Sequence, residues 1–176
     1  MANSFNVNRG LPLGRYKLKQ IFSGLEEVKP LRICIGNSGL FEKILNETWV
    51  TLSPEQGYMY VNDEDGSLVV GADYLRTASE NYLYLDIIHE LVHVKQYFQG
   101  KELFDRNYSY VDRPTEIEAY HCSVEEGRRI GMDENWIAEY LYVEWVTRKD
   151  HDRLLKTLGV RPASWRRTTF GESRLV

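Results

Sequence analysis

The chain has 176 residues, of which 43% are hydrophobic, 27% charged and 12% aromatic, and its net charge is −4 at pH 7. This length and composition predict a single domain, residues 1–176, and exclude collagen-like, mucin-like and disordered chains. The sequence contains no run of about 18 apolar residues that would cross a membrane, and no secretory signal at its start. We therefore expect a soluble cytoplasmic protein without a membrane partner.

Basic residues gather at both ends of the chain, in residues 1–30 and 161–176. Basic segments of an otherwise acidic protein can bind nucleic acid or lie on the protein itself, and we expect the second. Cys34 and Cys122 are far apart and form no CxxC motif. We expect two ordinary thiols rather than a disulfide or a pair of metal ligands.

The first half of the chain predicts short elements. Residues 1–30 are interrupted by glycine and proline and predict irregular structure with one short helix. Residues 39–46 suit a brief helix. Strands are expected at 31–36, 49–52, 58–61 and 67–70, and the last two flank an Asn-Asp-Glu-Asp-Gly turn that indicates a hairpin.

The second half predicts helices. Residues 81–100 are apolar on most sides of a helix that Gly100 ends, and Pro114 opens a second helix that reaches about residue 129. Asp133 is a helix N-cap, and we expect one long C-terminal helix from there to about Leu158. Strands followed by helices indicate the α+β class.

The first of these helices carries the motif His89-Glu90-Leu-Val-His93. Two histidines four residues apart lie on one face of a helix, where both imidazoles can reach one metal ion. The Glu90 carboxylate can then lie beside a water molecule on the metal, as a general base does. The alternative interpretation is a pair of core histidines satisfied by hydrogen bonds, but three ionisable residues are costly in an apolar helix.

A third metal ligand is expected on the second helix. Positions 96 and 99 are both glutamine, which excludes the HExxHxxGxxH pattern. Downstream, Glu116 stands three residues before Ala119, whose small side chain allows close helix packing. Glu118 is about 200° around the helix from Glu116, so both cannot ligate one metal ion. We favour Glu116 as the ligand and keep Glu118 as the alternative.

The HExxH motif with this Glu-x-x-Ala element resembles the zincin metallopeptidases, and specifically the small gluzincins, over roughly residues 58–130. The resemblance implies one zinc ion, Glu90 as the catalytic residue and a peptide or protein substrate. It also implies a small N-terminal sheet whose edge strand, expected at Ser67–Tyr74, lies over the cleft and binds the substrate backbone.

Two positions depart from the family pattern. Tyr120 stands where many gluzincins have an acid or asparagine that orients a histidine, and Lys95 stands where an apolar residue is common. Asp86 and Asp112 are candidates to orient the histidines instead. Candidates for stabilising the transition state, or for supporting the ligands, lie around the second helix: Tyr108, Tyr110, Tyr120 and His121.

These residues predict a zinc metalloprotease of narrow or limited substrate range. The alternative is a latent or regulatory zinc-binding module with little proteolytic activity, whose cleft a terminal segment (residues 1–30 or Trp165–Val176) would cover. Action on DNA-bound proteins has only the basic segments in its favour, so we do not expect a nucleic-acid partner. The sequence does not indicate the oligomeric state.

Overall fold

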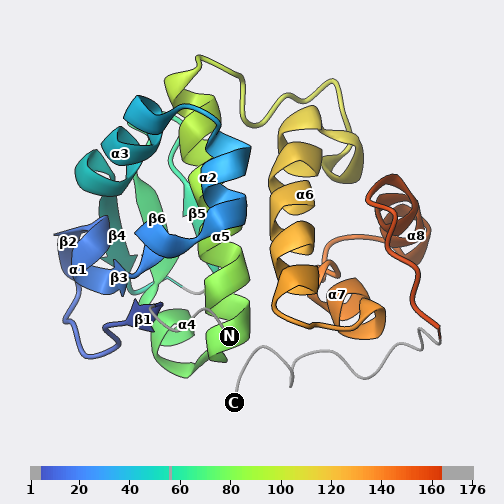
Figure 1. Ribbon diagram of the computed structural model, residues 1–176, viewed down its shortest axis with the longest axis horizontal. Helices are drawn as coiled ribbons and strands as arrows, with labels where there is room; N and C mark the ends of the chain where they lie inside the picture. The colour runs from blue at the N-terminus through green and yellow to red at the C-terminus, as the bar shows by residue number, and fades with distance from the viewer. Residues whose placement is uncertain (1–4, 56, 164–176) are drawn as a thin grey trace.

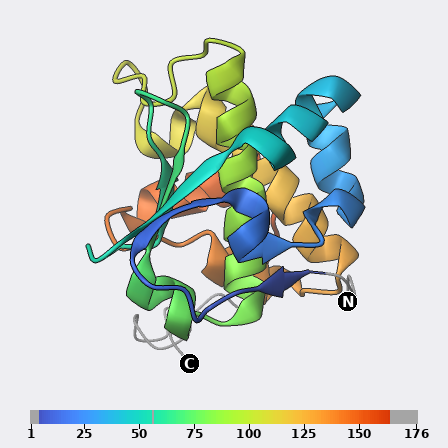
Figure 2. The same ribbon diagram turned by 90° about the vertical axis from the view of Figure 1, so that its left-hand side faces the viewer.

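The computed structural model describes residues 5–55 and 57–163, shown from two sides in Figures 1 and 2. The described strands end at residue 71 and the long helices follow, which confirms the α+β class. The strands are β1 (Asn6–Val7), β2 (Gly14–Lys17), β3 (Phe22–Ser23), β4 (Trp49–Ser53), β5 (Met59–Val61) and β6 (Leu68–Gly71). The helices are α1 (Leu18–Ile21), α2 (Lys29–Ile35), α3 (Ser38–Glu47), α4 (Ala72–Thr77), α5 (Glu80–Phe98), α6 (Pro114–Arg129), α7 (Glu134–Tyr140) and α8 (Arg148–Thr157).

The main sheet has four strands in the order β2-β4-β6-β5. The expected hairpin is confirmed, because β5 and β6 pair antiparallel. However, β6 also pairs in parallel with β4, so it is an interior strand. The prediction that Ser67–Tyr74 forms the edge strand is therefore wrong. The edge strand on this side is β5, and the residues after β6 turn into α4.

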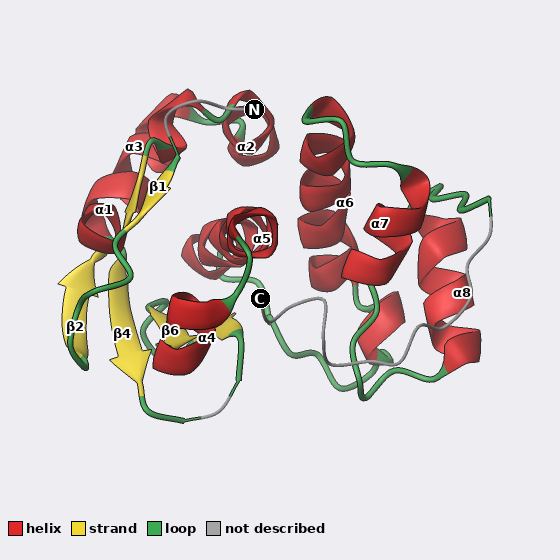
Figure 3. Ribbon diagram, turned by 90° about the horizontal axis from the view of Figure 1, so that it is seen from below, coloured by secondary structure: helices red, strands yellow, loops and turns green. Residues whose placement is uncertain are grey.

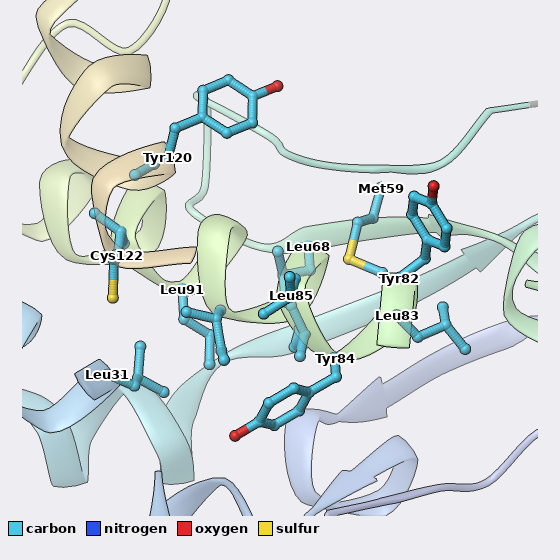
Figure 4. Packing of buried hydrophobic residues seen from close by; sticks show 14 of the residues in the cluster. Leu31, Met59, Leu68, Tyr82, Leu83, Tyr84, Leu85, Leu91, Tyr120 and Cys122 are labelled. Carbon is cyan, nitrogen blue, oxygen red and sulfur yellow. The ribbon is translucent and has the colours of Figure 1, made fainter. Parts of the chain in front are cut away.

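Helix α5 runs through the middle of the molecule. Viewed from below, it lies between the sheet on one side and α6 on the other, with α2 close by (Figure 3). Figure 4 shows Leu31 of α2, Leu85 and Leu91 of α5 and Cys122 of α6 in the shared core. Because apolar neighbours surround it, α5 has fourteen buried residues among nineteen, which explains its apolar character on most sides.

Residues 31–36 were expected as a strand, and this expectation is wrong. They belong to α2, where Pro30 lies in the first turn and Gly36 ends the helix with a φ of 75°. Leu31 and Ile35 are both buried, and their spacing of four residues places them on the same helical face. A short apolar run fits a strand or a helix equally well, and here packing against α3, α5 and α6 decides for the helix.

The prediction of one long C-terminal helix is also wrong, because the segment forms two helices. α7 ends at Tyr140 and α8 begins at Arg148. The side chain of Thr147 caps α8 by accepting a hydrogen bond from the backbone N–H of Asp150, which starts a new helix. The intervening residues include Val143, Glu144 and Trp145, which reach the cavity described below.

The N-terminal basic segment is part of the folded body, as expected, although it is more regular than irregular. Its described residues form β1–β3 and α1, with β2 at one edge of the main sheet. The Arg9 side chain donates a hydrogen bond to the carbonyl of Leu75 at 2.8 Å. Residues 164–176, which include the second candidate for covering a cleft, lie outside the described residues.

Cys34 and Cys122 form a disulfide between α2 and α6, so the expectation of two free thiols is wrong. They are 88 residues apart in sequence, but their helices pack side by side and bring their Cα atoms to 6.2 Å. None of the helices in the described part of the chain has both the length and the apolar character needed to span a bilayer.

Candidate metal centre

Helix α5 presents His89, Glu90 and His93 to one cavity. The four-residue spacing places both imidazoles on the same side of the helix, and their ring centroids are 4.6 Å apart. All three side chains are buried, with exposed fractions of 6%, 8% and 6%. The apolar residues between and beside them hold the helix in the core, so the motif is rigidly placed.

Helix α6 delivers Glu116 to the same point from its first turn. Pro114 begins the helix, and the Thr115 hydroxyl donates a hydrogen bond to the carbonyl of Leu103. One turn later Ala119 is completely buried, and the Ser123 hydroxyl donates to the carbonyl of Leu85 in α5 at 3.2 Å. Small side chains thus allow α6 to lie close against α5, which brings Glu116 to the two histidines.

The three candidate ligands converge. The Nε2 atoms of His89 and His93 are 3.0 Å apart, and Glu116 Oε2 is 3.3 Å from the first and 3.5 Å from the second. A tetrahedral zinc ion with bonds of about 2.0–2.1 Å would separate its ligand atoms by about 3.3–3.4 Å. In addition, Glu116 Oε2 is buried without a well-formed hydrogen bond in the described part. The group therefore fits a metal ion.

Glu118, the alternative ligand, lies elsewhere. Its carboxylate accepts hydrogen bonds from the ammonium groups of Lys95 and Lys101, at 2.7 and 2.8 Å, and from the amide of Gln96 at 2.9 Å. Lys95, the departure noted in the sequence, therefore has a structural partner. Of the two candidate ligands on α6, Glu116 is the one beside the histidines.

The electrostatics of the group indicate a place for positive charge. Burial disfavours ionisation of Glu116, but the two imidazoles outweigh it and hold the pKa of this carboxyl below its usual range. Burial likewise opposes charge on His93, but Glu116 prevails and raises the pKa of His93 to about 9. Burial lowers the pKa of His89 and raises that of Glu90 to about 8.

Gln96 orients His93, and sequence reasoning missed it. Its side-chain oxygen is 2.7 Å from Nδ1 of His93, while its amide nitrogen donates to the carbonyl of Thr115 and to Glu118. Because Gln96 is completely buried, these bonds fix the ring so that Nε2 faces Glu116. The only signal available was a polar residue three positions after His93, on the same side of an apolar helix.

Neither aspartate proposed for this role contacts a histidine. Asp86 lines the cavity, but its carboxylate accepts a hydrogen bond from the Tyr74 hydroxyl, and the buried Nδ1 of His89 has no partner among the described residues. Asp112 lies outside the cavity. It pairs with Arg153 of α8 at 2.8 Å and with the hydroxyl of Ser109.

The four candidates for transition-state stabilisation or ligand support divide into two groups. Tyr110 and Tyr120 line the cavity, their hydroxyl oxygens are 2.7 Å apart, and the Tyr120 ring packs against His89 with centroids 4.3 Å apart. Burial raises the pKa of Tyr110 well above its ordinary value, so its hydroxyl stays protonated. Tyr108 and His121 are exposed and do not line the cavity.

Arg113 is a further cavity residue and lies directly before the start of α6. Its guanidinium is 3.5 Å from Glu116 Oε1, whereas the two histidines contact the other carboxylate oxygen, Oε2. Its Nε also donates to the carbonyl of Asp105. Arg113 thus steadies Glu116 and presents donors to the cavity. His151 of α8 lies outside the cavity lining, is buried and is hydrogen-bonded to the carbonyl of Ala138.

The cavity has a volume of about 930 Å³ and is bounded by the edge strand β5, α4, α5, the start of α6 and the α7–α8 connection. No residue from 5–30 lines it, so the described part of the N-terminal segment does not cover the site. A cavity of this size beside three convergent ligands and a buried carboxyl is suited to metal-assisted chemistry on a bound molecule. No protein-family model matches this chain, and neither a curated protein nor a solved structure does.

Proposed function

We propose that this chain is a zinc-dependent metallopeptidase of the small gluzincin type, with a zincin-like fold. His89, His93 and Glu116 would hold one zinc ion, and Glu90 would act as the general base. The observation that carries the proposal is the convergence of two imidazole nitrogens and one carboxylate oxygen in a cavity that Glu90 also lines. Two histidines and a glutamate are a frequent donor set for catalytic zinc.

A zinc ion bound there would act as a Lewis acid, which lowers the pKa of a water molecule and polarises a peptide carbonyl. The Glu90 carboxylate would accept the protons of the attacking water and pass them to the leaving amine, so that one water and one peptide bond give a carboxylate and a protonated amine. The Tyr110–Tyr120 hydroxyl pair and the Arg113 guanidinium are the donors near the ligands that can stabilise the developing oxyanion.

The substrate backbone would add to β5. This strand is the sheet edge on the cavity side, and Tyr58 to Val61 line the cavity along its length. An extended peptide paired with this edge lies along α5, beside Glu90 and the histidines. The proposed role of an edge strand is thereby retained, although β5 takes it in place of Ser67–Tyr74.

The test compares cleavage of a mixed peptide library by three zinc-loaded proteins: wild type, Glu90→Gln and Glu102→Gln. Glu102 is an exposed acid of the α5–α6 connection outside the cavity and serves as the matched control. We expect wild type and Glu102→Gln to cleave, and Glu90→Gln to lose about 10²- to 10⁴-fold in rate while keeping its zinc. Equal cleavage by Glu90→Gln, or no cleavage by the zinc-loaded wild type, would contradict the proposal.

A further inference from the structure

The cavity has an acidic and aromatic end that the proposed chemistry does not use. It lies where α4, the start of β5, the middle of α5 and the α7–α8 connection meet, and its residues include Tyr58, Tyr74, Asp86 and Glu144. The two tyrosine rings are in edge contact, with centroids 5.1 Å apart. Tyr74 donates its hydroxyl to Asp86, and Tyr58 donates its hydroxyl to Glu144 at 2.8 Å. The two tyrosines, through their ring contact and their hydroxyl groups, therefore hold both carboxylates on the same side of the cavity.

These carboxylates have no cationic partner in the described part of the chain. Asp86 is only 9% exposed, and its one hydrogen bond among the described residues comes from the neutral hydroxyl of Tyr74. Glu144 is exposed, but Asp86 differs from two other acids that are buried or half-buried: Glu126 binds the Arg129 guanidinium through both oxygens at 2.6 Å, and Glu118 pairs with two lysines. A buried carboxylate without a countercharge is costly, so Asp86 stands out.

A metal ion does not explain this end. Among the described residues, His89, His93 and Glu116 are the one group of three or more such side chains close enough to hold an ion together. The acids at the other end are spread over a wall of aromatic rings instead. Such a wall suits an organic cation, because the rings pack along an aliphatic stem and attract an ammonium or guanidinium group, while the carboxylates accept its hydrogen bonds.

We infer that this end of the cavity is a subsite for a cationic group of the substrate, either the side chain of lysine or arginine or the free amino group of a peptide. The inference rests on the proposed peptidase function for the identity of the ligand as a peptide. Arg113, the basic residue that lines the cavity, is at the start of α6 and is paired with Glu116. It therefore does not neutralise Asp86 or Glu144.

The test measures peptide binding without turnover, using zinc-loaded Glu90→Gln protein and fluorescence anisotropy. The probes are labelled alanine-based hexapeptides that carry lysine at each position in turn. Matched peptides carry norleucine or Nε-acetyl-lysine at the same position, and every peptide is made with a free and with an acetylated N-terminus. The second variants are Glu144→Gln and, as an exposed control on α3, Glu42→Gln, each in the Glu90→Gln background.

We expect one lysine position to bind about tenfold or more tightly than norleucine. This preference should disappear in Glu144→Gln and persist in Glu42→Gln. If lysine and norleucine peptides instead bind alike and acetylation of the N-terminus weakens the binding of both, the recognised cation is the free amino group. Equal binding of charged and neutral peptides, no measurable binding of any peptide, or an unchanged preference in Glu144→Gln would overturn the subsite.

The two proposals fail separately in this design. A lysine preference in binding, together with an inactive zinc-loaded wild type, would keep the cationic subsite and remove the peptidase function. Cleavage by wild type with no preference for a positive charge would keep the peptidase function and remove the subsite. Asp86→Asn, which retains an acceptor for the Tyr74 hydroxyl, gives a second check at the more buried of the two carboxylates, provided that its zinc content matches wild type.

Discussion

The residues of α5 on the two sides of the histidines differ in how their charges are neutralised. Beyond His93, Gln96 bonds both to the imidazole and to Glu118, and two lysines neutralise that glutamate. Before His89, the one hydrogen-bond donor to the Asp86 carboxylate in the described chain is a tyrosine hydroxyl. Polar groups that the protein satisfies itself stabilise the site, whereas a buried group left without a countercharge is a place where a ligand can complete the set.

The two histidines repeat this difference on a smaller scale. Nδ1 of His93 is held by Gln96, but Nδ1 of His89 is buried with no hydrogen-bond partner in the described chain. The ring of His89 is instead positioned by packing against Tyr120. At Nδ1, one imidazole is thus oriented by a polar network, whereas the other is positioned by ring packing, and the Gln96 prediction below tests the polar network.

The largest difference in bound metal is expected between substitutions of Glu116 and Glu118, the two candidate ligands on α6. Glu116→Gln should lose nearly all bound zinc, because it removes one of three ligands, whereas Glu118→Gln should retain it. Zinc per chain after dialysis against a weak chelator measures both. If Glu118→Gln lost the metal and Glu116→Gln kept it, the assignment of the third ligand would be wrong.

Removing the disulfide is expected to have the next largest effect, on stability rather than on the ligands. The bridge joins residues 88 apart, and a loop of this length can stabilise a fold by up to about 4.5 kcal/mol. Cys34→Ser/Cys122→Ser should therefore unfold at lower urea concentration while its folded form still binds zinc. An unchanged urea midpoint would show that α2 and α6 are held together without the bridge.

Loss of the Gln96 network should weaken metal binding without unfolding the chain. Gln96→Met preserves the length of this buried side chain but removes its hydrogen bonds, and we expect the affinity for zinc to fall about 10- to 100-fold. Gln99→Met, on the exposed end of the same helix, is the control. Competition with a chromophoric chelator measures both affinities, and identical values would remove Gln96 from the site.

The smallest effect is expected on the stability of the fold at low pH. Burial favours the protonated form of Glu118, but hydrogen bonds from Lys101, Lys95 and Gln96 outweigh it and lower the pKa to about 2. Because this is below the ordinary value of 4.5, the ionised carboxylate stabilises the fold above that pH, and the contribution is lost as pH falls toward 2. In metal-free protein, Glu118→Gln should flatten this part of the stability curve. An unchanged curve would mean that Glu118 is not stabilised by its lysines.

The sequence was sufficient to predict helices α5 and α6 and the candidate ligands on them, because the signals for these features are local. The i, i+4 histidines, the apolar helix around them and Pro114 before Glu116 each act within a few residues. The convergence of Glu116 with the histidines follows once two long helices must pack. Gln96 was missed because a glutamine carries no spacing signal of its own, and its role appears only when α6 supplies Thr115 and Glu118.

The wrong predictions concern features that depend on pairing between distant residues or on short segments whose pattern fits more than one structure. The edge position of β5 depends on β6 pairing in parallel with β4, which no local pattern specifies. Two errors had usable signals: Pro30 before and Gly36 after residues 31–35 mark a helix start and end, and Thr147-x-x-Asp150 marks a new helix start. The disulfide required knowing that α2 lies against α6.

The measurement that tests the central claim most directly is the metal content of each chain, by elemental mass spectrometry that reads zinc and iron together, on protein purified without added metal. The proteins are wild type, His93→Ala and, as a control at an exposed histidine of the neighbouring helix, His121→Ala. We predict about one zinc ion per chain in wild type and His121→Ala, and nearly none in His93→Ala. Equal metal in all three, iron in place of zinc, or a wild type that stays metal-free after incubation with zinc would contradict the account.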